Sequence, residues 1–319
     1  MLKIIIVGGA GFIGSNLTKH LLEMGHKVTC LDNFSTSTVT NVLDVMNHPN
    51  FELVTWDLVS YDNRDAEIFE TADVVYNLAS IPSPKDYINR CDETIEVNIT
   101  GVMNLLKLIP DTVRLIHISS SEIYGDTGKP EQVEDDIDCI IDTNSVRSCY
   151  SESKRVGETL VFNSIRSGLN GTVVRVFNTY GPGMLPEDGR VVTEFLTADI
   201  ESKSMVIVGN GRQTRSFCYI DDMCTALIRL IDVPVRVINL GNPEEITITS
   251  LAHLCNTKGI VPTFTELRAI GDVTSRKPNI DIATEVLEWI PSTPLHEGLE
   301  LTREYLIKTL KRNCNQAGV

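Results

Sequence analysis

The chain has 319 residues, enough for one large core or two unequal lobes. Its 28 lysines and arginines stand against 43 aspartates and glutamates, and this net charge of −15 argues against nucleic acid or an anionic membrane surface as a partner. No apolar run reaches membrane-spanning length, so we expect no membrane segment. Eight scattered cysteines without a C-x-x-C pair predict reduced thiols in a cytoplasmic protein, with neither a disulfide framework nor a metal site.

The amino-terminal segment has the order strand, glycine-rich turn, helix, strand and acid. A β-branched run over 3–7 predicts a buried parallel strand, and glycines spaced G-x-x-G-x-x-G follow at once over 8–14. Such glycines let the backbone approach a pyrophosphate, and the next helix, which Gly25 closes, offers its N-terminal N–H groups to that anion. A second strand over 27–31 ends on Asp32, whose carboxylate suits a ribose and would repel a 2′-phosphate. The segment therefore predicts binding of NAD rather than NADP.

Strands and helices then alternate up to about residue 177. The predicted strands cover 52–56, 73–78, 114–118 and 172–177, and the predicted helices cover 93–109 and 150–166. This alternation predicts an α/β fold with a doubly wound parallel (Rossmann) sheet, whose ligands lie beyond the carboxyl ends of the strands. Besides Tyr150 and Lys154, the cofactor-binding residues predicted there are Gly8, Gly11, Phe12, Ile13, Gly14, Asp32, Asn33, Phe34, Ser35, Asp57, Leu58, Leu78, Ala79 and Ser80.

Tyr150 is the only one of the eight tyrosines with a lysine four residues later, Lys154. On a helix these positions share one face, so a phenol and an ammonium can point into one cleft. A phenol titrates near pH 10 and is a poor base at neutrality, but an adjacent cation favours the phenolate. The pair therefore predicts a general base, although a helix whose Tyr and Lys merely lie side by side is the alternative. Ser120, Ser121 and Glu122, which follow the strand over 114–118, are predicted to face the same crevice.

The second half of the chain has more turns and less regular alternation. We expect 1–177 plus about 212–243 to form the dinucleotide-binding domain, and about 178–211 plus 244–319 to form a smaller α/β lobe that closes over the crevice. Four arginines of this half lie in turn-like contexts near Gly or Pro: Arg190, Arg212, Arg215 and Arg276. Guanidinium groups match phosphate oxygens bidentately, so several of them would suit a diphosphate, although any single surface arginine is more often solvated.

Several of these segments resemble the extended short-chain dehydrogenase/reductases that act on nucleotide sugars. The segments that carry the resemblance are 8–14, 120–126, 149–155, 175–182, 188–192, 213–222 and 276–278. The Ser120–Glu122 triplet and the blocks over 188–192 and 213–222 are most similar to the UDP-glucuronate decarboxylase (UDP-xylose synthase) branch.

The resemblance implies NAD as cofactor and a redox-neutral reaction of UDP-glucuronate. Tyr150, helped by Lys154, would take the proton of the sugar's 4-hydroxyl while hydride passes to NAD, and Ser120 would hydrogen-bond the same oxygen. Carbon dioxide could then leave from the 4-keto sugar as an enolate forms. Ser121 and Glu122 would position water or a proton donor at carbon 5, and returning hydride would give UDP-xylose.

The same resemblance implies a substrate site and a partner. Uridine and diphosphate would be held by Asn178, Arg190, Arg215 and Arg276, and Tyr87 would approach the sugar. Relatives pair through the helices expected here over 93–109 and 150–166, so a homodimer is implied.

Two departures keep other functions open. Glu96 stands where the decarboxylases commonly carry Lys, and Gly183 stands where they usually have Arg. A UDP-sugar 4-epimerase, which rotates the 4-keto sugar instead of decarboxylating it, is therefore the second candidate. A 4,6-dehydratase ranks third. Such enzymes usually have Asp immediately before the Glu, whereas this chain has Ser121 there, which cannot readily donate a proton. An NAD-binding sensor or scaffold is the non-enzyme alternative, against which Tyr150 and Lys154 argue.

Overall fold

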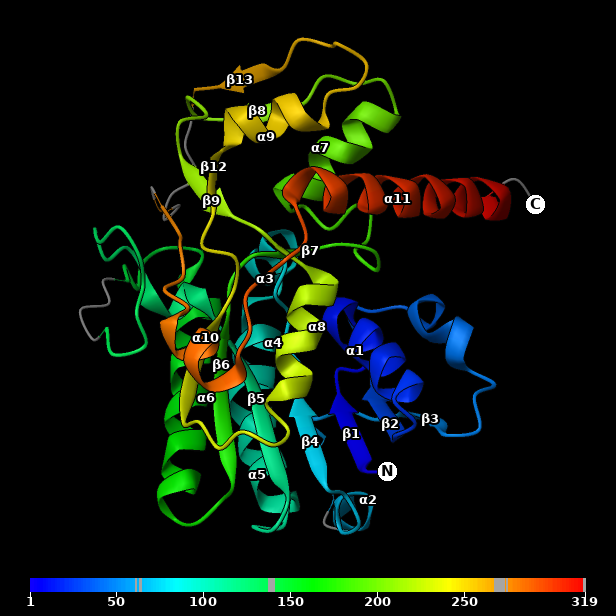
Figure 1. The fold of residues 1–319 in the computed structure, drawn as a ribbon, viewed down its shortest axis with the longest axis vertical. Helices are drawn as coiled ribbons and strands as arrows, with labels where there is room; N and C mark the ends of the chain where they lie inside the picture. Colours follow the sequence, from blue (N-terminus) through cyan, green and yellow to red (C-terminus); the bar gives the residue numbers. More distant parts are fainter. Residues whose placement is uncertain (61, 63–64, 137–140, 267–272, 274, 318–319) are drawn as a thin grey trace.

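A computed structural model describes residues 1–60, 62, 65–136, 141–266, 273 and 275–317. Its centre is a sheet of seven parallel strands in the order β11-β6-β5-β4-β1-β2-β3 (Figure 1). The strands are β1 (Lys3–Val7), β2 (Lys27–Asp32), β3 (Phe51–Thr55), β4 (Val74–Asn77), β5 (Arg114–Ser120), β6 (Gly171–Val176) and β11 (Val237–Leu240). The predicted doubly wound sheet is thus confirmed, and its order reverses between β1 and β4, where such sheets bind ligands.

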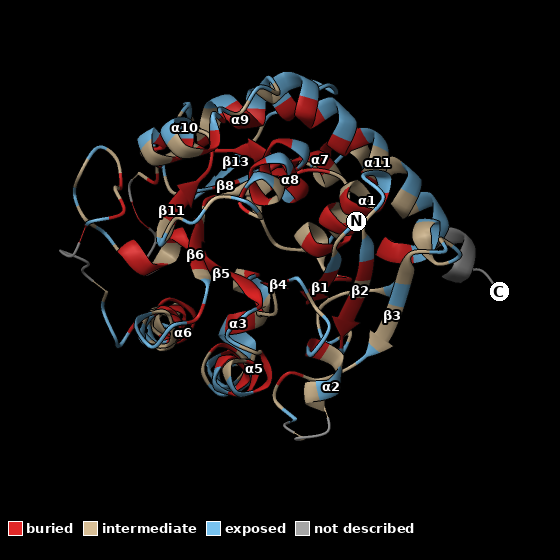
Figure 2. Ribbon diagram, turned by 60° about the horizontal axis from the view of Figure 1, so that its bottom comes forward, coloured by how far each residue is buried: buried red, intermediate tan, exposed pale blue. Residues whose placement is uncertain are grey.

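Helices cover both faces of the sheet, which explains why β4 and β5 are buried along their whole length (Figure 2). One face carries α4 (Cys91–Glu96), the π-helical turn η3 (Val97–Gly101), α5 (Val102–Leu108) and α6 (Ser148–Arg166). The other face carries α1 (Phe12–Glu23), α8 (Ile220–Arg229) and α10 (Asp281–Leu287). The helix predicted over 93–109 is thus one helix interrupted by a π turn.

A smaller lobe lies beyond the carboxyl ends of the strands, at the top of Figure 1. It contains α7 (Val191–Ile200), β8 (Val206–Val208), β9 (Thr214–Ser216), β12 (Glu245–Thr247), α9 (Ile248–Cys255), β13 (Thr263–Thr265) and α11 (Leu295–Ala317). A buried ion pair between Asp199 of α7 and Arg303 joins α7 to α11. Short elements elsewhere are η1 (Val39–Val45), α2 (Ala66–Phe69), α3 (Pro84–Asn89), η4 (Ser121–Tyr124), β7 (Thr179–Tyr180) and β10 (Cys218–Tyr219).

Membrane spans and metal clusters were both sought in the described part of the chain. No helix there is long and apolar enough to cross a bilayer. No group of three or more His, Cys, Asp or Glu side chains in the same residues could hold a metal ion.

A buried ion pair fixes α6 against the sheet. Nη2 of Arg175, on β6, lies 2.9 Å from Oε2 of Glu158, on α6, and both side chains are buried. The other end of the guanidinium, Nη1, donates to the Tyr124 hydroxyl (2.9 Å) and to the Glu134 carbonyl (2.7 Å). These bonds satisfy a charge that would otherwise be costly to bury. They also fix the position of the helix that carries Tyr150, two turns before Glu158.

We therefore expect Glu158→Gln to lower the free energy of unfolding by about 3–5 kcal/mol, because it leaves the buried Arg175 charge without its counterion. Urea denaturation checks this. Glu152→Gln is the matched control on the same helix, because Glu152 pairs with Arg155 at the surface and such pairs contribute about 0.2–1 kcal/mol. Equal losses in the two variants would contradict the prediction.

Candidate active site

One cavity of about 1360 Å³ extends from the carboxyl ends of the strands to the lobe. Pockets for one drug-sized ligand usually measure roughly 300–1,000 Å³, so this cavity has room for a dinucleotide and a second ligand. Most of the residues predicted from the sequence line it: Gly8, Gly11, Phe12, Ile13, Gly14, Asp32, Asn33, Ser35, Asp57, Leu58, Leu78, Ala79, Ser80, Tyr87, Ser120, Ser121, Glu122, Tyr150, Lys154, Asn178, Arg190 and Arg215.

Three residues singled out in the sequence do not line the cavity: Arg212, which is exposed at the surface, and the predicted site residues Phe34 and Arg276. The Phe34 side chain packs against a small apolar cluster around Val42, and its backbone N–H donates to the Asp32 carboxylate. Arg276 is almost fully buried behind Glu122, where its Nη1 donates to the Gly125 carbonyl at 2.9 Å. Phe34 and Arg276 adjoin the cavity in sequence, but their side chains turn toward the protein interior.

The glycine-rich turn fits a pyrophosphate of NAD. Gly8 has φ +79°, and a Cβ there would lie 2.8 Å from the Ala79 nitrogen. A Cβ on Gly14 would lie 2.5 Å from the Gly8 carbonyl oxygen, so side chains at either position would fill the turn. Helix α1 begins after Gly11 with no side-chain cap and no acidic residue in its first turn. Its first N–H groups and the positive end of its dipole are therefore open to an anion.

Asp32, at the end of β2, lies in the wall of the same region. Its carboxylate accepts hydrogen bonds from the backbone N–H groups of Ala10 and Phe34, both at 2.9 Å, and from Oγ of Ser37 at 2.8 Å. An ionised carboxylate has about four acceptor positions, so one remains for a ribose hydroxyl. The negative charge that these bonds hold in place would repel a 2′-phosphate.

The Tyr150 phenol lies between two serine hydroxyls at the ends of neighbouring strands. Ser120 is the last residue of β5 and Ser80 lies three residues after β4, and both hydroxyls act as hydrogen-bond partners that lower the pKa of Tyr150. The Tyr87 ring stacks on the Tyr150 ring with centroids 5.1 Å apart and planes 11° apart. Burial raises the pKa of the Tyr150 phenol, and the two serine hydrogen bonds offset this only in part. The protein alone therefore positions the phenol but leaves it protonated at neutral pH.

Lys154 lies one turn further along α6, beneath the phenol. Its Nζ is 6.0 Å from the centroid of the Tyr150 ring and donates to the Ile118 carbonyl at 2.9 Å. Burial lowers the pKa of Lys154 to about 8, although the nearby Glu158 carboxylate opposes this shift. The side chain therefore stays mostly charged at neutral pH and is held by the backbone of β5.

Three arginines surround Glu122. Its Oε1 lies 3.7 Å from Nη2 of Arg147, and its Oε2 lies 3.8 Å from Nη2 of Arg276. Burial disfavours the charged form, but the positive charges of Arg276, Arg147 and Arg215 outweigh it and hold the pKa of Glu122 below its usual value. Glu122 is therefore a carboxylate at neutral pH and cannot itself supply a proton.

Arg147 and Asn98 are site residues that the sequence reasoning missed. Arg147 precedes Tyr150 by three residues in helical geometry, a spacing that places both on one face and could have identified it. Its guanidinium lies 5.9 Å from the centroid of the Tyr87 ring, within the range of a cation–π contact. Asn98, in the π turn η3, accepts from Oγ of Ser80 (2.8 Å) and donates to Oγ of Ser153 (2.9 Å). These contacts of Asn98 arise from tertiary packing, and no sequence motif predicts them.

The cations expected from the decarboxylases are replaced in the cavity wall. Glu96 and Gly183 both line the cavity, as their positions in the resemblance predict. Among the lining arginines, Arg90 lies near the predicted cofactor-binding residue Ser35 and donates to its carbonyl (3.1 Å) and its hydroxyl (2.6 Å). The remaining lining arginines are Arg147, Arg190 and Arg215, of which Arg147 pairs with Glu122 and Arg190 pairs with Asp188 at 3.2 Å.

Comparison with known proteins identifies a family and relatives that match most of the chain. The model of the NAD dependent epimerase/dehydratase family matches residues 4–241. UDP-glucuronic acid decarboxylase 1 of Xenopus tropicalis is 38% identical over 320 residues, which cover 98% of this chain and 74% of the relative. UDP-glucuronic acid decarboxylase 3 of Arabidopsis thaliana is also 38% identical, over 95% of this chain and 88% of its own.

Solved structures extend the likeness to the whole fold. UDP-glucuronic acid 4-epimerase from Bacillus cereus, in complex with UDP-glucuronic acid and NAD, superposes with a TM-score of 0.84 at 27% identity, over 97% of this chain and all of that one. UDP-glucose 4-epimerase from Thermotoga maritima, with UDP-glucose, gives 0.86 at 28% identity over the same shares. The chain therefore belongs to the NAD dependent epimerase/dehydratase family, and its cofactor is NAD.

Proposed function

We propose that this protein decarboxylates UDP-glucuronate to UDP-xylose through a 4-keto sugar, with NAD as a cofactor that is regenerated in each cycle. The observation that carries the proposal is Glu122, a carboxylate held ionised by arginines beside Tyr150 and Ser120. Epimerisation at carbon 4 needs no such group. The decarboxylase names of relatives that match nearly the whole chain support the same reaction.

Tyr150 and Ser120 act on the oxygen at carbon 4 of the sugar. The phenol oxygen of Tyr150 accepts the hydroxyl proton, and the Ser120 hydroxyl hydrogen-bonds the same oxygen. NAD, when bound, accepts and returns a hydride and adds a pyridinium charge that favours the phenolate. The 4-ketone is β to the carboxylate, so carbon dioxide can leave and the electrons of the broken bond form an enolate. The Tyr150 phenol and Ser120 then stabilise the enolate oxygen.

Glu122 and Ser121 control the proton that carbon 5 must receive. Because Glu122 is ionised, it orients a water molecule as an acceptor and does not donate the proton directly. Ser121 is buried beside it and offers a hydroxyl to the same water. We therefore assign proton delivery to a positioned water, which gives a proton to carbon 5 and regains one from bulk solvent; the sequence left this open as water or another donor.

The arginines of the substrate side supply the charge that a trianionic substrate requires. Arg190 and Arg215 line the cavity in the lobe and suit the diphosphate, with Asn178 beside them. Arg147 lies next to Glu122 and Tyr87, near the sugar, and suits the substrate carboxylate. It thereby offsets the loss of the cations that Glu96 and Gly183 replace.

The 4-epimerase is the second candidate, because the Bacillus cereus structure with UDP-glucuronic acid has the same fold. Incubation of the protein with UDP-glucuronate and NAD decides between them by mass spectrometry. We expect a product lighter by the mass of carbon dioxide, whereas a product of unchanged mass would identify an epimerase.

Tyr150→Phe should slow turnover at least ~100-fold, since it deletes the base, while calorimetry still detects NAD binding. If Tyr150→Phe retained more than half the parent rate, Tyr150 would not be the base.

Glu122→Gln keeps the size of the side chain and an acceptor but removes the negative charge. We expect xylose formation to slow roughly 100-fold, with substrate binding much less affected, because the water at carbon 5 is no longer oriented by a carboxylate. NADH absorbance and 4-keto species should accumulate during a single turnover. If product forms at the parent rate with no NADH signal, Glu122 does not act after the first oxidation.

We also propose a homodimer through the outer faces of α4, α5 and α6. Apolar side chains remain exposed there although the inner faces cover the sheet: Ile95, Met103 and Val156. Light scattering at micromolar concentration should give the mass of two chains, and Met103→Glu combined with Val156→Glu should give one. Leu254→Glu, an exposed apolar position on α9, is the control and should leave the mass unchanged. A monomeric parent protein would rule the dimer out.

A further inference from the structure

Arg215 and Arg276 reach the site on two segments that are distant in sequence. Arg215 is the central residue of β9 and lines the cavity. Arg276 lies in an extended segment over 275–279 and contacts Glu122 from behind. The Ser216 hydroxyl donates to the Arg276 carbonyl at 3.3 Å, so the two segments run side by side.

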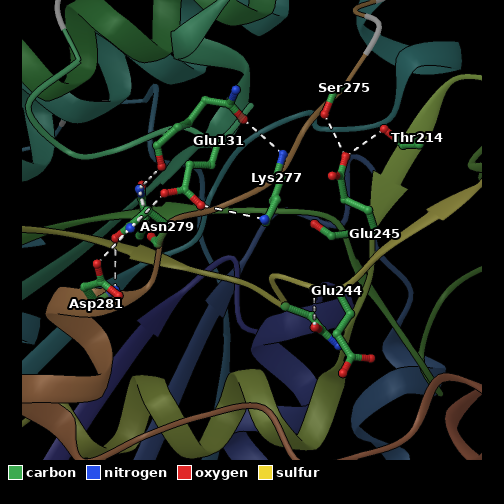
Figure 3. Close-up of polar contacts among 12 residues, drawn as sticks. Glu131, Thr214, Glu244, Glu245, Ser275, Lys277, Asn279 and Asp281 are labelled. Atoms are coloured by element: carbon green, nitrogen blue, oxygen red, sulfur yellow. Dashed lines mark hydrogen bonds and ion pairs between the residues drawn. The ribbon is translucent and has the colours of Figure 1, made fainter. Parts of the chain in front are cut away.

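Glu245 joins these two segments outside the cavity (Figure 3). A single oxygen, Oε1, accepts hydrogen bonds from Oγ1 of Thr214 and from Oγ of Ser275, both at 2.7 Å. Thr214 immediately precedes Arg215, and Ser275 immediately precedes Arg276. Glu245 itself is fixed because β12 pairs with β9 in an antiparallel register, with Glu245 opposite Ser216.

The far end of the 275–279 segment is attached to the sheet domain. The Gln132 N–H donates to the Lys277 carbonyl (2.9 Å), and the Lys277 N–H donates back to Oε1 of Gln132 (3.0 Å). Nδ2 of Asn279 donates to Oε1 of Glu131 at 3.2 Å, as Figure 3 shows. Arg276 therefore lies between an attachment to the sheet domain and the Glu245 attachment to the lobe.

We infer that Glu245 is a positioning residue, which holds Arg215 against the nucleotide sugar and Arg276 against Glu122 at the same time. The inference rests on the proposed function, because it names a residue that acts on the same substrate site. Glu245 does not line the cavity, so its effect passes through the Thr214 and Ser275 hydroxyls. Removing its oxygen lets the segment that carries Arg276 move relative to the strand that carries Arg215.

The test compares Glu245→Ala, Glu245→Gln and Glu244→Ala. Glu245→Ala should raise KM for UDP-glucuronate about three- to tenfold, as expected for lost hydrogen bonds, with a smaller change in kcat and none in the Kd of NAD. Glu245→Gln should restore the parent KM, because its carbonyl oxygen can accept both bonds. Glu244→Ala is the control, since the Glu244 side chain points away from both hydroxyls in Figure 3.

The pH profile gives a readout that a merely structural role would not change. If Arg276 moves away from Glu122, the pKa of that carboxyl rises, so Glu245→Ala should lose activity at a higher pH on the acid side than the parent does. In a Thr214→Val, Ser275→Ala background, Glu245→Ala should have no further effect, because its partners are already gone.

The outcomes separate this inference from the proposed function. If the parent turns over UDP-glucuronate but Glu245→Ala matches Glu244→Ala in KM and pH profile, or if Glu245→Gln is as impaired as Glu245→Ala, Glu245 is not a positioning residue. If the parent gives no turnover of UDP-glucuronate, the proposed function fails. Calorimetry with UDP then tests the same variants, and an unchanged Kd in Glu245→Ala overturns the inference.

Discussion

The buried ion pair between Arg175 and Glu158 is the constraint on which the site depends. It fixes α6 against β6 by a charged contact whose geometry is directional, whereas apolar packing alone would tolerate small shifts of the helix. The Tyr150 phenol has the hydroxyls of Ser80, after β4, and Ser120, at the end of β5, as hydrogen-bond partners, so a small displacement of α6 would separate the phenol from both. The pair lies near the reacting groups without taking part in the chemistry.

A second constraint is the distribution of charge around Glu122. Burial alone would raise the pKa of this carboxyl, but arginines from three separate parts of the chain lower it below its usual value. Arg147 comes from the start of α6, Arg215 from β9 and Arg276 from the segment after residue 274. The ionisation state of one side chain thus depends on how the lobe and the sheet domain meet. This is a property of the assembled tertiary structure.

The alternation of strands and helices in the sequence predicted the sheet and most of the cavity wall. Parallel strands place their carboxyl ends at one edge of the sheet, and a glycine-rich turn at that edge is typical of a dinucleotide site. It could not show which way a side chain turns. Phe34 and Arg276 adjoin the crevice in sequence, yet one packs inward and the other lies behind Glu122. Arg147 does face the cavity but was not predicted, because Tyr150 and Lys154 account for the sequence motif by themselves. Contacts such as Ser80 with Asn98 depend on tertiary packing and have no signature in a single sequence.

The hydrogen bonds of Asp32 bear on how this protein could evolve or be redesigned. The carboxylate that we predict to bind the ribose also ties the glycine turn, through Ala10, to the loop after β2, through Phe34 and Ser37. A change of coenzyme preference that removed this charge would leave two backbone donors without their acceptor and loosen the turn that we predict to bind the pyrophosphate. Redesign toward a phosphorylated coenzyme must therefore rebuild the loop together with the charge.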